Sequence, residues 1–261
     1  MNVVLALFPL ASFFVWSCVT TPVTNRQSVR LLPESQLNSM GVQAYKEMLQ
    51  KEKESADPRY NEMVRRIGQR IATVSGKNYQ WEFKVIDNSQ MVNAFCLPGG
   101  KVAVYTGILP VAKNEAGLAA VMGHEVAHAI LQHGNERVSQ QLLIQAGLVV
   151  TAISLNNNKY RNLILGGLGV GSTIGVALPF SRMHESEADR VGTEYMARAG
   201  YDPREAVELW HRMGAQGGGK MPQFLSTHPD PTKRAQDLSK RMGEMIPLYE
   251  ASAAKQASTP I

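Results

Sequence analysis

The chain has 261 residues, of which 44% are hydrophobic and 19% are charged, so it can bury a core in one domain. Its net charge of +5 comes from scattered lysines and arginines, without a basic block between aromatic residues, which argues against nucleic-acid binding. With only two cysteines, Cys18 and Cys96, the chain has no disulfide framework.

The N-terminal segment predicts export. Residues 1–17 carry no charge, and a polar stretch follows Cys18. The four residues that end at Cys18 resemble a bacterial lipobox, in which the chain is cleaved before the cysteine and Cys18 receives a lipid. Two features depart from that pattern, because no Lys or Arg precedes the run and Trp16 is bulky for its place. The alternative is a buried or membrane-anchoring helix.

A small sheet is predicted in the first half of the chain. Apolar and polar residues alternate over 79–86, which predicts a half-buried strand. Segments 91–97 and 101–106 flank the turn Pro98-Gly99-Gly100 and predict a hairpin. We expect this sheet to be antiparallel.

Apolar periodicity and capping residues predict the helices. An almost continuous apolar run from Leu118 to Leu131 predicts a buried helix that begins after the N-cap Asn114 and ends before Gly134. The other predicted helices are amphipathic and cover 37–48, 57–76, 184–199, 203–213 and 231–245.

Two further apolar runs, 142–155 and 163–180, lie between these groups of helices. The first run is short and the second is rich in glycine, so we expect a soluble pair of helices. A membrane hairpin over the same residues is the alternative.

The pattern His124-Glu125-Val126-Ala127-His128 lies on the predicted buried helix. A spacing of four places both imidazoles on one face, one turn apart, where they can bind a single Zn²⁺. Glu125 then lies beside the metal, where it can take a proton from the attacking water and pass it to the departing amine. Chance is the alternative, but an apolar helix that buries these three side chains without partners loses several kcal/mol in desolvation.

A hydrolytic zinc site needs a third protein ligand and an open position. The residue six after His128 is Gly134, so the third histidine of a metzincin is missing. Downstream, Glu185 and Asp189 form an ExxxD segment and share one helix face. This spacing allows Glu185 to bind zinc and Asp189 to accept the free ring N–H of a ligand histidine. Glu187 is the rival ligand, but it lies roughly on the opposite face.

The HEVAH motif, the later segment SRMHESEAD and the THP that follows resemble the HtpX and CaaX prenyl protease family of gluzincin metallopeptidases, from about Asn93 to Arg234. Exported bacterial BepA-like and LoiP-like proteases look nearest within it. The resemblance implies that Glu185 is the third zinc ligand and that Asp189 is the aspartate of the family's ExxxD segment. We expect a mainly helical α+β fold, with a small antiparallel sheet beside the HExxH helix.

His228, in Ser226-Thr227-His228-Pro229, resembles the family's histidine near the metal. Two roles are open: His228 can donate to the oxyanion of the tetrahedral intermediate, or it can occupy the open zinc position in a latent state. A loop histidine held for structure by Pro229 is a third reading. Arg234 would orient this loop or bind a carboxylate.

Asn93, Ala94 and Phe95 resemble the family's strand before the hairpin turn, and they are the expected substrate-binding residues. An edge strand there could hold an extended peptide by backbone hydrogen bonds. A purely structural hairpin is compatible with the same pattern. Cys96 is expected to be a small core residue, because its neighbours are apolar.

The sequence therefore predicts a zinc-dependent endopeptidase with one Zn²⁺ per chain, bound by His124, His128 and Glu185, with Glu125 and His228 as catalytic residues. The resemblance implies substrates among unfolded or misassembled proteins of a bacterial cell envelope, with the enzyme on the periplasmic side and lipid-anchored at Cys18 to the outer membrane. The expected parts of the chain are a signal peptide with lipobox (1–18), a tether (19–32), a metallopeptidase domain (33–250) and a flexible tail (251–261).

Two other functions remain as alternatives. The first is a zinc-containing chaperone-like or scaffold protein with latent proteolytic activity, which a closed site with His228 on the metal would suit. The second is an integral-membrane protease that uses 142–180 as a hairpin.

Overall fold

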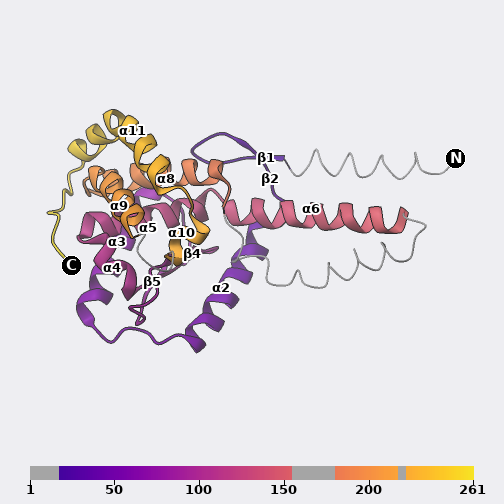
Figure 1. Cartoon of the computed structure of the whole chain (residues 1–261), viewed down its shortest axis with the longest axis horizontal. Helices are drawn as coiled ribbons and strands as arrows, with labels where there is room; N and C mark the ends of the chain where they lie inside the picture. The colour runs from indigo at the N-terminus through magenta and orange to yellow at the C-terminus, as the bar shows by residue number, and fades with distance from the viewer. Residues whose placement is uncertain (1–17, 155–179, 217–221) are drawn as a thin grey trace. The chain divides into compact units, whose positions relative to one another are not determined.

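The computed structural model describes residues 18–154, 180–216 and 222–261 (Figure 1). The chain forms two compact units. Among the described residues, one unit contains 18–34 and 132–154, and the other contains 35–131, 180–216 and 222–261.

The first unit contains a short hairpin and a long helix. Strands β1 (Cys18–Thr20) and β2 (Gln27–Val29) pair antiparallel, with Cys18 opposite Val29. Helix α6 (His133–Ser154) lies in the same unit, and its Asn135 donates a side-chain hydrogen bond to the carbonyl of Leu32 at 2.9 Å. No helix in the described part of the chain is long and apolar enough to span a membrane. Both the export segment and the run 163–179 fall outside the described residues.

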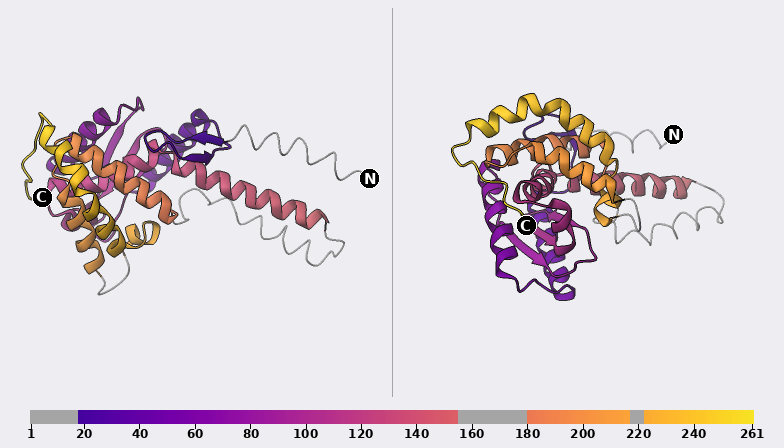
Figure 2. Two further views of the ribbon diagram at one scale, coloured as in Figure 1. Left: turned by 90° about the horizontal axis from the view of Figure 1, so that it is seen from above. Right: turned by 60° about the vertical axis from the view of Figure 1, so that its left-hand side comes forward.

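The second unit is mainly helical, as predicted. Its helices are α2 (Glu34–Lys51), α3 (Pro58–Ser75), η1 (Thr106–Ile108), α4 (Leu109–Ala112), α5 (Glu115–Ile130), α8 (Arg182–Arg198), α9 (Arg204–Ala215), α10 (Gln223–Thr227) and α11 (Pro231–Ala251). Figure 2 shows α11 lying along α8 and α9, with which it is in contact. The sequence predicts these helices to within a few residues, except for η1 and α4, which follow β5, and α10, which carries no strong periodic signal.

The sheet consists of β3 (Glu82–Ile86), β4 (Ala94–Leu97) and β5 (Lys101–Tyr105), in the order β3-β5-β4. The predicted hairpin is confirmed, because β4 and β5 are antiparallel. The expectation of a wholly antiparallel sheet is wrong, because β3 pairs with β5 in parallel. After β3 the chain crosses to the far edge and forms β4 there, so β5 returns in the middle of the sheet in the same direction as β3.

Helix α5 runs through the core of the second unit, and its residues 115–130 are all buried. The side chain of Asn114 caps its N-terminus by accepting a hydrogen bond from the amide of Gly117 at 2.8 Å. The helix ends at Ile130, because Gln132 has a φ of 57° that interrupts helical geometry. The expected stop at Gly134 is therefore wrong, and Gly134 belongs to α6.

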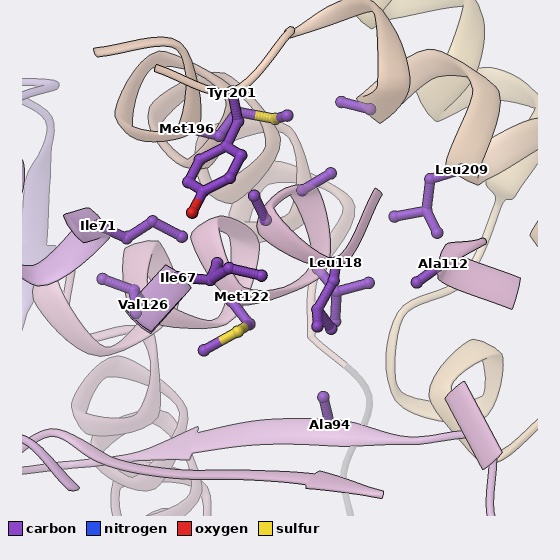
Figure 3. Packing of buried hydrophobic residues seen from close by; sticks show 14 of the residues in the cluster. Ile67, Ile71, Ala94, Ala112, Leu118, Met122, Val126, Met196, Tyr201 and Leu209 are labelled. Carbon is purple, nitrogen blue, oxygen red and sulfur yellow. The ribbon is translucent and has the colours of Figure 1, made fainter. Parts of the chain in front are cut away.

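Two glycines let α5 approach α8 closely. A methyl group on Gly123 would lie 2.6 Å from the carbonyl oxygen of Gly192, so neither position has room for a side chain. Around this contact, residues from α3, α5, α8, α9 and β4 form one hydrophobic cluster, part of which Figure 3 shows around Met122 and Leu118. This packing fixes the two helices on which the chemistry of the site depends.

Candidate metal centre

Helix α5 supplies two histidines to a buried polar cluster in the second unit. His124 and His128 are each only 3% exposed, and their Nε2 atoms lie 3.0 Å apart. The four-residue spacing predicts this arrangement, since residues i and i+4 share a helix face. Two ring nitrogens that face each other in a dry core share one proton at most, so a metal ion would complete the pair.

Glu185 reaches the same point from the first turn of α8. Ser181 caps this helix by accepting a hydrogen bond from the amide of His184, and the turn that follows directs Glu185 inward. The Oε1 atom of Glu185 lies 3.3 Å from Nε2 of His128, and its Oε2 atom lies 3.6 Å from Nε2 of His124. The structure thus brings the residues predicted as metal ligands together.

His228 joins the cluster from the residue after α10. Its Nδ1 atom lies 3.2 Å from Nε2 of His124 and 3.1 Å from Oε1 of Glu185. Nitrogen and carboxylate ligands at 2.0–2.1 Å from a tetrahedral ion are themselves about 3.3 Å apart. The donor atoms of His124, His128, Glu185 and His228 lie within 4.8 Å of one another, and their chemistry and spacing fit a zinc ion.

Glu125 lies beside this cluster and is 3% exposed. Burial, together with the nearby carboxylate of Glu185, raises the pKa of Glu125 to about 7, although His228, Arg234 and a backbone hydrogen bond from Cys96 oppose that shift. Nε2 of His228 is 3.3 Å from Oε1 of Glu125. A carboxyl group with such a pKa suits proton transfer near neutral pH.

Asp189 lies one turn after Glu185, behind His124. Its Oδ1 atom is 3.1 Å from Nδ1 of His124, which is the position predicted for an acceptor of the ring N–H. Burial would raise the pKa of Asp189, but the charge and hydrogen bonds of Arg234, assisted by His124, lower it. Asp189 is therefore an anion that can hold His124 in one orientation.

Arg234, in the first turn of α11, connects the carboxylates of α8. Its Nε and Nη2 atoms bind Asp189 at 2.7 Å and 2.5 Å, and its Nη1 atom lies 2.5 Å from Oε2 of Glu185. Burial favours the neutral form of Glu185, yet Arg234, His128 and His228 together lower the pKa of this carboxyl group far below its usual range. The sequence suggests a carboxylate-binding role for Arg234 without identifying either partner.

Burial and the guanidinium of Arg234 lower the pKa of His124 to about 4. His124 is therefore neutral at physiological pH, as a metal ligand must be.

The predicted substrate strand lies next to the cluster. Strand β4 is at the edge of the sheet and contacts α5, and Cys96 on this strand forms the backbone hydrogen bond to Glu125. Ala94 is buried, Phe95 is half-buried, and the carbonyl of Asn93 accepts a hydrogen bond from the amide of Tyr105 at 3.1 Å. The predicted substrate residues Asn93, Ala94 and Phe95 directly precede Cys96 in the chain, so their segment lies beside Glu125, the candidate general base.

Three aromatic residues of the site are not predicted from the sequence, and one of them, Phe180, lies with its ring centroid 4.0 Å from that of His128. Trp210, on α9, places its ring 3.4 Å from the guanidinium carbon of Arg234. Phe224, on α10, lies 4.5 Å from the ring of His228. The amphipathic pattern of α9 predicts that Trp210 is buried, but no local signal identifies its partner.

The sequence matches the model of peptidase family M48 over residues 58–242. It is 35% identical to the mitochondrial metalloendopeptidase OMA1 of Schizosaccharomyces pombe over 247 residues, which cover 92% of this chain and 71% of that protein. It is 28% identical to the human metalloendopeptidase OMA1, mitochondrial, over 95% of this chain and 50% of that protein. The beta-barrel assembly-enhancing protease of Escherichia coli is 26% identical over 76% of this chain and 42% of its own length.

These relatives correct one expectation and leave two others without support. The bacterial outer-membrane location is wrong, because relatives that match more than nine-tenths of this chain are mitochondrial enzymes of eukaryotes. The lipid anchor at Cys18 was part of that expectation and receives no support. The likeness to the beta-barrel assembly-enhancing proteases agrees with the BepA-like resemblance, whereas the narrower HtpX, CaaX prenyl protease and LoiP-like assignments are unsupported. The chain spans about half or less of most of these relatives.

Proposed function

Since this chain belongs to peptidase family M48 and is a metalloendopeptidase, we propose that it cleaves proteins with one zinc ion bound by His124, His128 and Glu185. The observation that carries this proposal is the close approach, at 3.0–3.6 Å, of buried donor atoms contributed by α5, α8 and the residue after α10. A zinc ion bound there would supply Lewis acidity toward a water molecule and the scissile carbonyl.

Glu125 is the proposed general base. Its carboxylate accepts a proton from the attacking water and returns it to the departing amine, which breaks the peptide bond. Without the metal, burial raises the pKa of Glu125 to about 7, and the positive charge of a zinc ion beside it would favour the carboxylate form that the base requires. Asp189 holds the ring of His124, and Arg234 keeps Asp189 ionised within the core.

His228 is the residue that distinguishes an open site from a closed one. Because its Nδ1 atom lies among the other donor atoms, the arrangement supports a latent state in which His228 fills the fourth ligand position. Movement of the His228 side chain away from the other donor atoms would free that position, and His228 could then donate to the oxyanion. A latent, chaperone-like protein is the second candidate function, and the position of His228 is the observation that favours it.

The substrate in this proposal is a protein segment in extended form. Strand β4 has no neighbouring strand on its outer side in the described part of the chain, so its backbone can pair with a peptide. The backbone hydrogen bond that Cys96 of this strand donates to Glu125 supports a peptide position beside the base. Backbone pairing makes little demand on side chains, which suits unfolded or misassembled proteins as the substrate class.

The test is cleavage of unfolded casein by the purified chain, with its zinc content measured on the same sample. We expect chelator-sensitive cleavage that is lost in Glu125→Gln while zinc is retained, and loss of zinc in Glu185→Gln but not in the control Glu187→Gln. Cleavage by Glu125→Gln would overturn the base assignment, and a zinc-free wild type would overturn the metal assignment. A protein that binds zinc without cleaving is latent; cleavage gained in His228→Ala would then assign the closure to His228, and no gain would fit its role as oxyanion donor.

A further inference from the structure

We propose that Trp210 is a positioning residue, whose indole ring holds Arg234, His124 and Phe224 in place and thereby sets both metal affinity and turnover. This inference rests on the proposed function, because it concerns how the ligands of the same metal site are held in position. Trp210 is 2% exposed and contributes no donor atom to the cluster.

The first contact of Trp210 is with the guanidinium of Arg234, which lies 3.4 Å from the ring centroid. The guanidinium of an arginine that stacks on an aromatic ring lies parallel to that ring. The N–H groups of the guanidinium then point outward from its own edges. In Arg234 those edges bind Asp189 and Glu185. The indole therefore fixes the plane in which the guanidinium meets the two carboxylates.

The second contact is with His124, whose ring lies edge-on to Trp210 at a centroid distance of 5.9 Å and an angle of 77°. A third is with Phe224, stacked at 5.8 Å, which in turn packs on His228 at 4.5 Å. Aromatic pairs at these distances have preferred orientations as well as buried area. Trp210 thus contacts one donor directly and a second through Phe224.

The helix that carries Trp210 is hydrogen-bonded to α4, the short helix that precedes α5 in the chain. Arg212 donates hydrogen bonds to the carbonyl oxygens of Val111 and Ala112, at 2.8 Å and 3.0 Å, immediately before the HExxH helix. It also pairs with Glu205 on the same helix at 3.1 Å. Because of these bonds, α9 is a fixed support for Trp210 rather than a loosely packed outer helix.

The experiment compares Trp210→Leu and Trp210→Phe with a matched control, Trp81→Leu. Trp81 is a partly buried tryptophan of the same unit, which stacks on Phe83 at 6.1 Å. Zinc affinity is measured by competition with a chelator, kcat and KM are measured on an unfolded protein, and folding is followed by circular dichroism and thermal unfolding.

We expect Trp210→Leu to weaken zinc binding and to lower kcat, each by roughly tenfold, with KM little changed, as for residues that orient metal ligands. Trp210→Phe keeps an aromatic face and should recover most of both losses. Trp81→Leu should lower thermal stability without changing zinc affinity or kcat.

A folded Trp210→Leu protein with wild-type zinc affinity and kcat would overturn the inference, as would equal losses in Trp81→Leu. If Trp210→Leu does not fold, Trp210→Met replaces it, because methionine fills volume without an aromatic face. A double-mutant cycle on zinc affinity tests the route through Arg234. Trp210→Leu should weaken zinc binding less in an Arg234→Lys background than in the wild type. Additive losses of zinc affinity would show that Trp210 does not act through Arg234. A wild type that binds no zinc would instead refute the proposed function.

Discussion

Arg234 donates two parallel hydrogen bonds to Asp189, from Nε at 2.7 Å and from Nη2 at 2.5 Å, and both side chains are buried. The remaining nitrogen of the same guanidinium lies 2.5 Å from Glu185. One cation therefore balances two buried carboxylates, and it links the start of α11 to the ExxxD segment of α8.

Loss of the Arg234 guanidinium should lower the free energy of unfolding. Arg234→Met leaves Asp189 and Glu185 buried without their counter-charge, and such a loss typically destabilises a protein by about 3–5 kcal/mol. Urea unfolding of the metal-free protein measures it, with Arg241→Met on the same helix as the control, since Arg241 is half-exposed and only 4.0 Å from Glu244. Equal unfolding midpoints for the two variants would contradict this account of the ion pair.

Glu125 should make the metal-free protein less stable as pH rises. Its folded-state pKa of about 7 lies above the ordinary value of 4.5, so the folded state binds the proton more tightly than the unfolded state. The stability that this proton confers is fully present below pH 4.5 and is lost as the pH rises to about 7. A shift of this size is worth about 3 kcal/mol.

Glu125→Gln tests this dependence, because glutamine has nearly the same shape and does not titrate. Unfolding free energies are measured in urea at pH 5 and pH 8 with chelator present. We expect the variant to gain stability over the wild type at pH 8 and to lose that advantage at pH 5. A difference that is the same at both pH values would exclude a raised pKa for Glu125 in the metal-free protein.

Gly200 should resist substitution. It has a φ of +90°, and a methyl group there would lie 2.1 Å from the carbonyl oxygen of Ala254. We expect Gly200→Ala to lose more than about 1 kcal/mol of stability, because the backbone conformation and the close approach both disfavour a side chain. Gly243→Ala is the control with the opposite sign, since Gly243 lies in α11 with open space around it and alanine should add about 0.5–1 kcal/mol.

Hydrogen exchange locates the effect of Gly200→Ala. The amide of Gln256 donates to the carbonyl of Gly200 at 2.8 Å, and the amide of Glu115 donates to Thr259 at 3.0 Å. We expect both amides to exchange faster in Gly200→Ala, because the segment that contains Ala254 is displaced. Unchanged protection at these two amides would mean that the chain absorbs the methyl group elsewhere.

Cys96 should react slowly with alkylating reagents. Burial raises the pKa of its thiol well above the ordinary value, and the nearby carboxylate of Glu125 adds to that shift. In a Cys18→Ser background, we expect iodoacetamide at pH 8 to label Cys96 far more slowly in the folded protein than in urea. Rapid labelling of the folded protein would show an accessible thiolate beside the base.

The sequence predicts those parts of the fold and site that depend on local spacing. His124 and His128 share a face because four residues separate them on a helix, and Glu185 and Asp189 do so for the same reason. The hairpin of β4 and β5 follows from alternation around a Pro-Gly-Gly turn. The structure brings these residues into one cluster, as the sequence analysis expects.

The features that the sequence does not predict depend on contacts between distant segments. Nothing in the local pattern of 82–86 reveals that its partner is the second strand of a later hairpin, so the parallel pairing is missed. The amphipathic pattern of α9 predicts only that Trp210 is buried, and it does not distinguish a residue that supports the site from any other core residue. The position of His228 depends on α10, which is only five residues long and has no periodic signal.

The residues of this site are synthesised at different times. His124 and Arg234, whose side chains touch, are separated by 110 positions in the chain, and the ExxxD segment lies between them. A ribosome adds residues one by one, at about 5–20 per second, so the HExxH helix is complete several seconds before the arginine that holds its surroundings exists. We therefore expect the nascent chain to lack proteolytic activity until Arg234 has been synthesised, which would spare the neighbouring unfolded polypeptides at the ribosome.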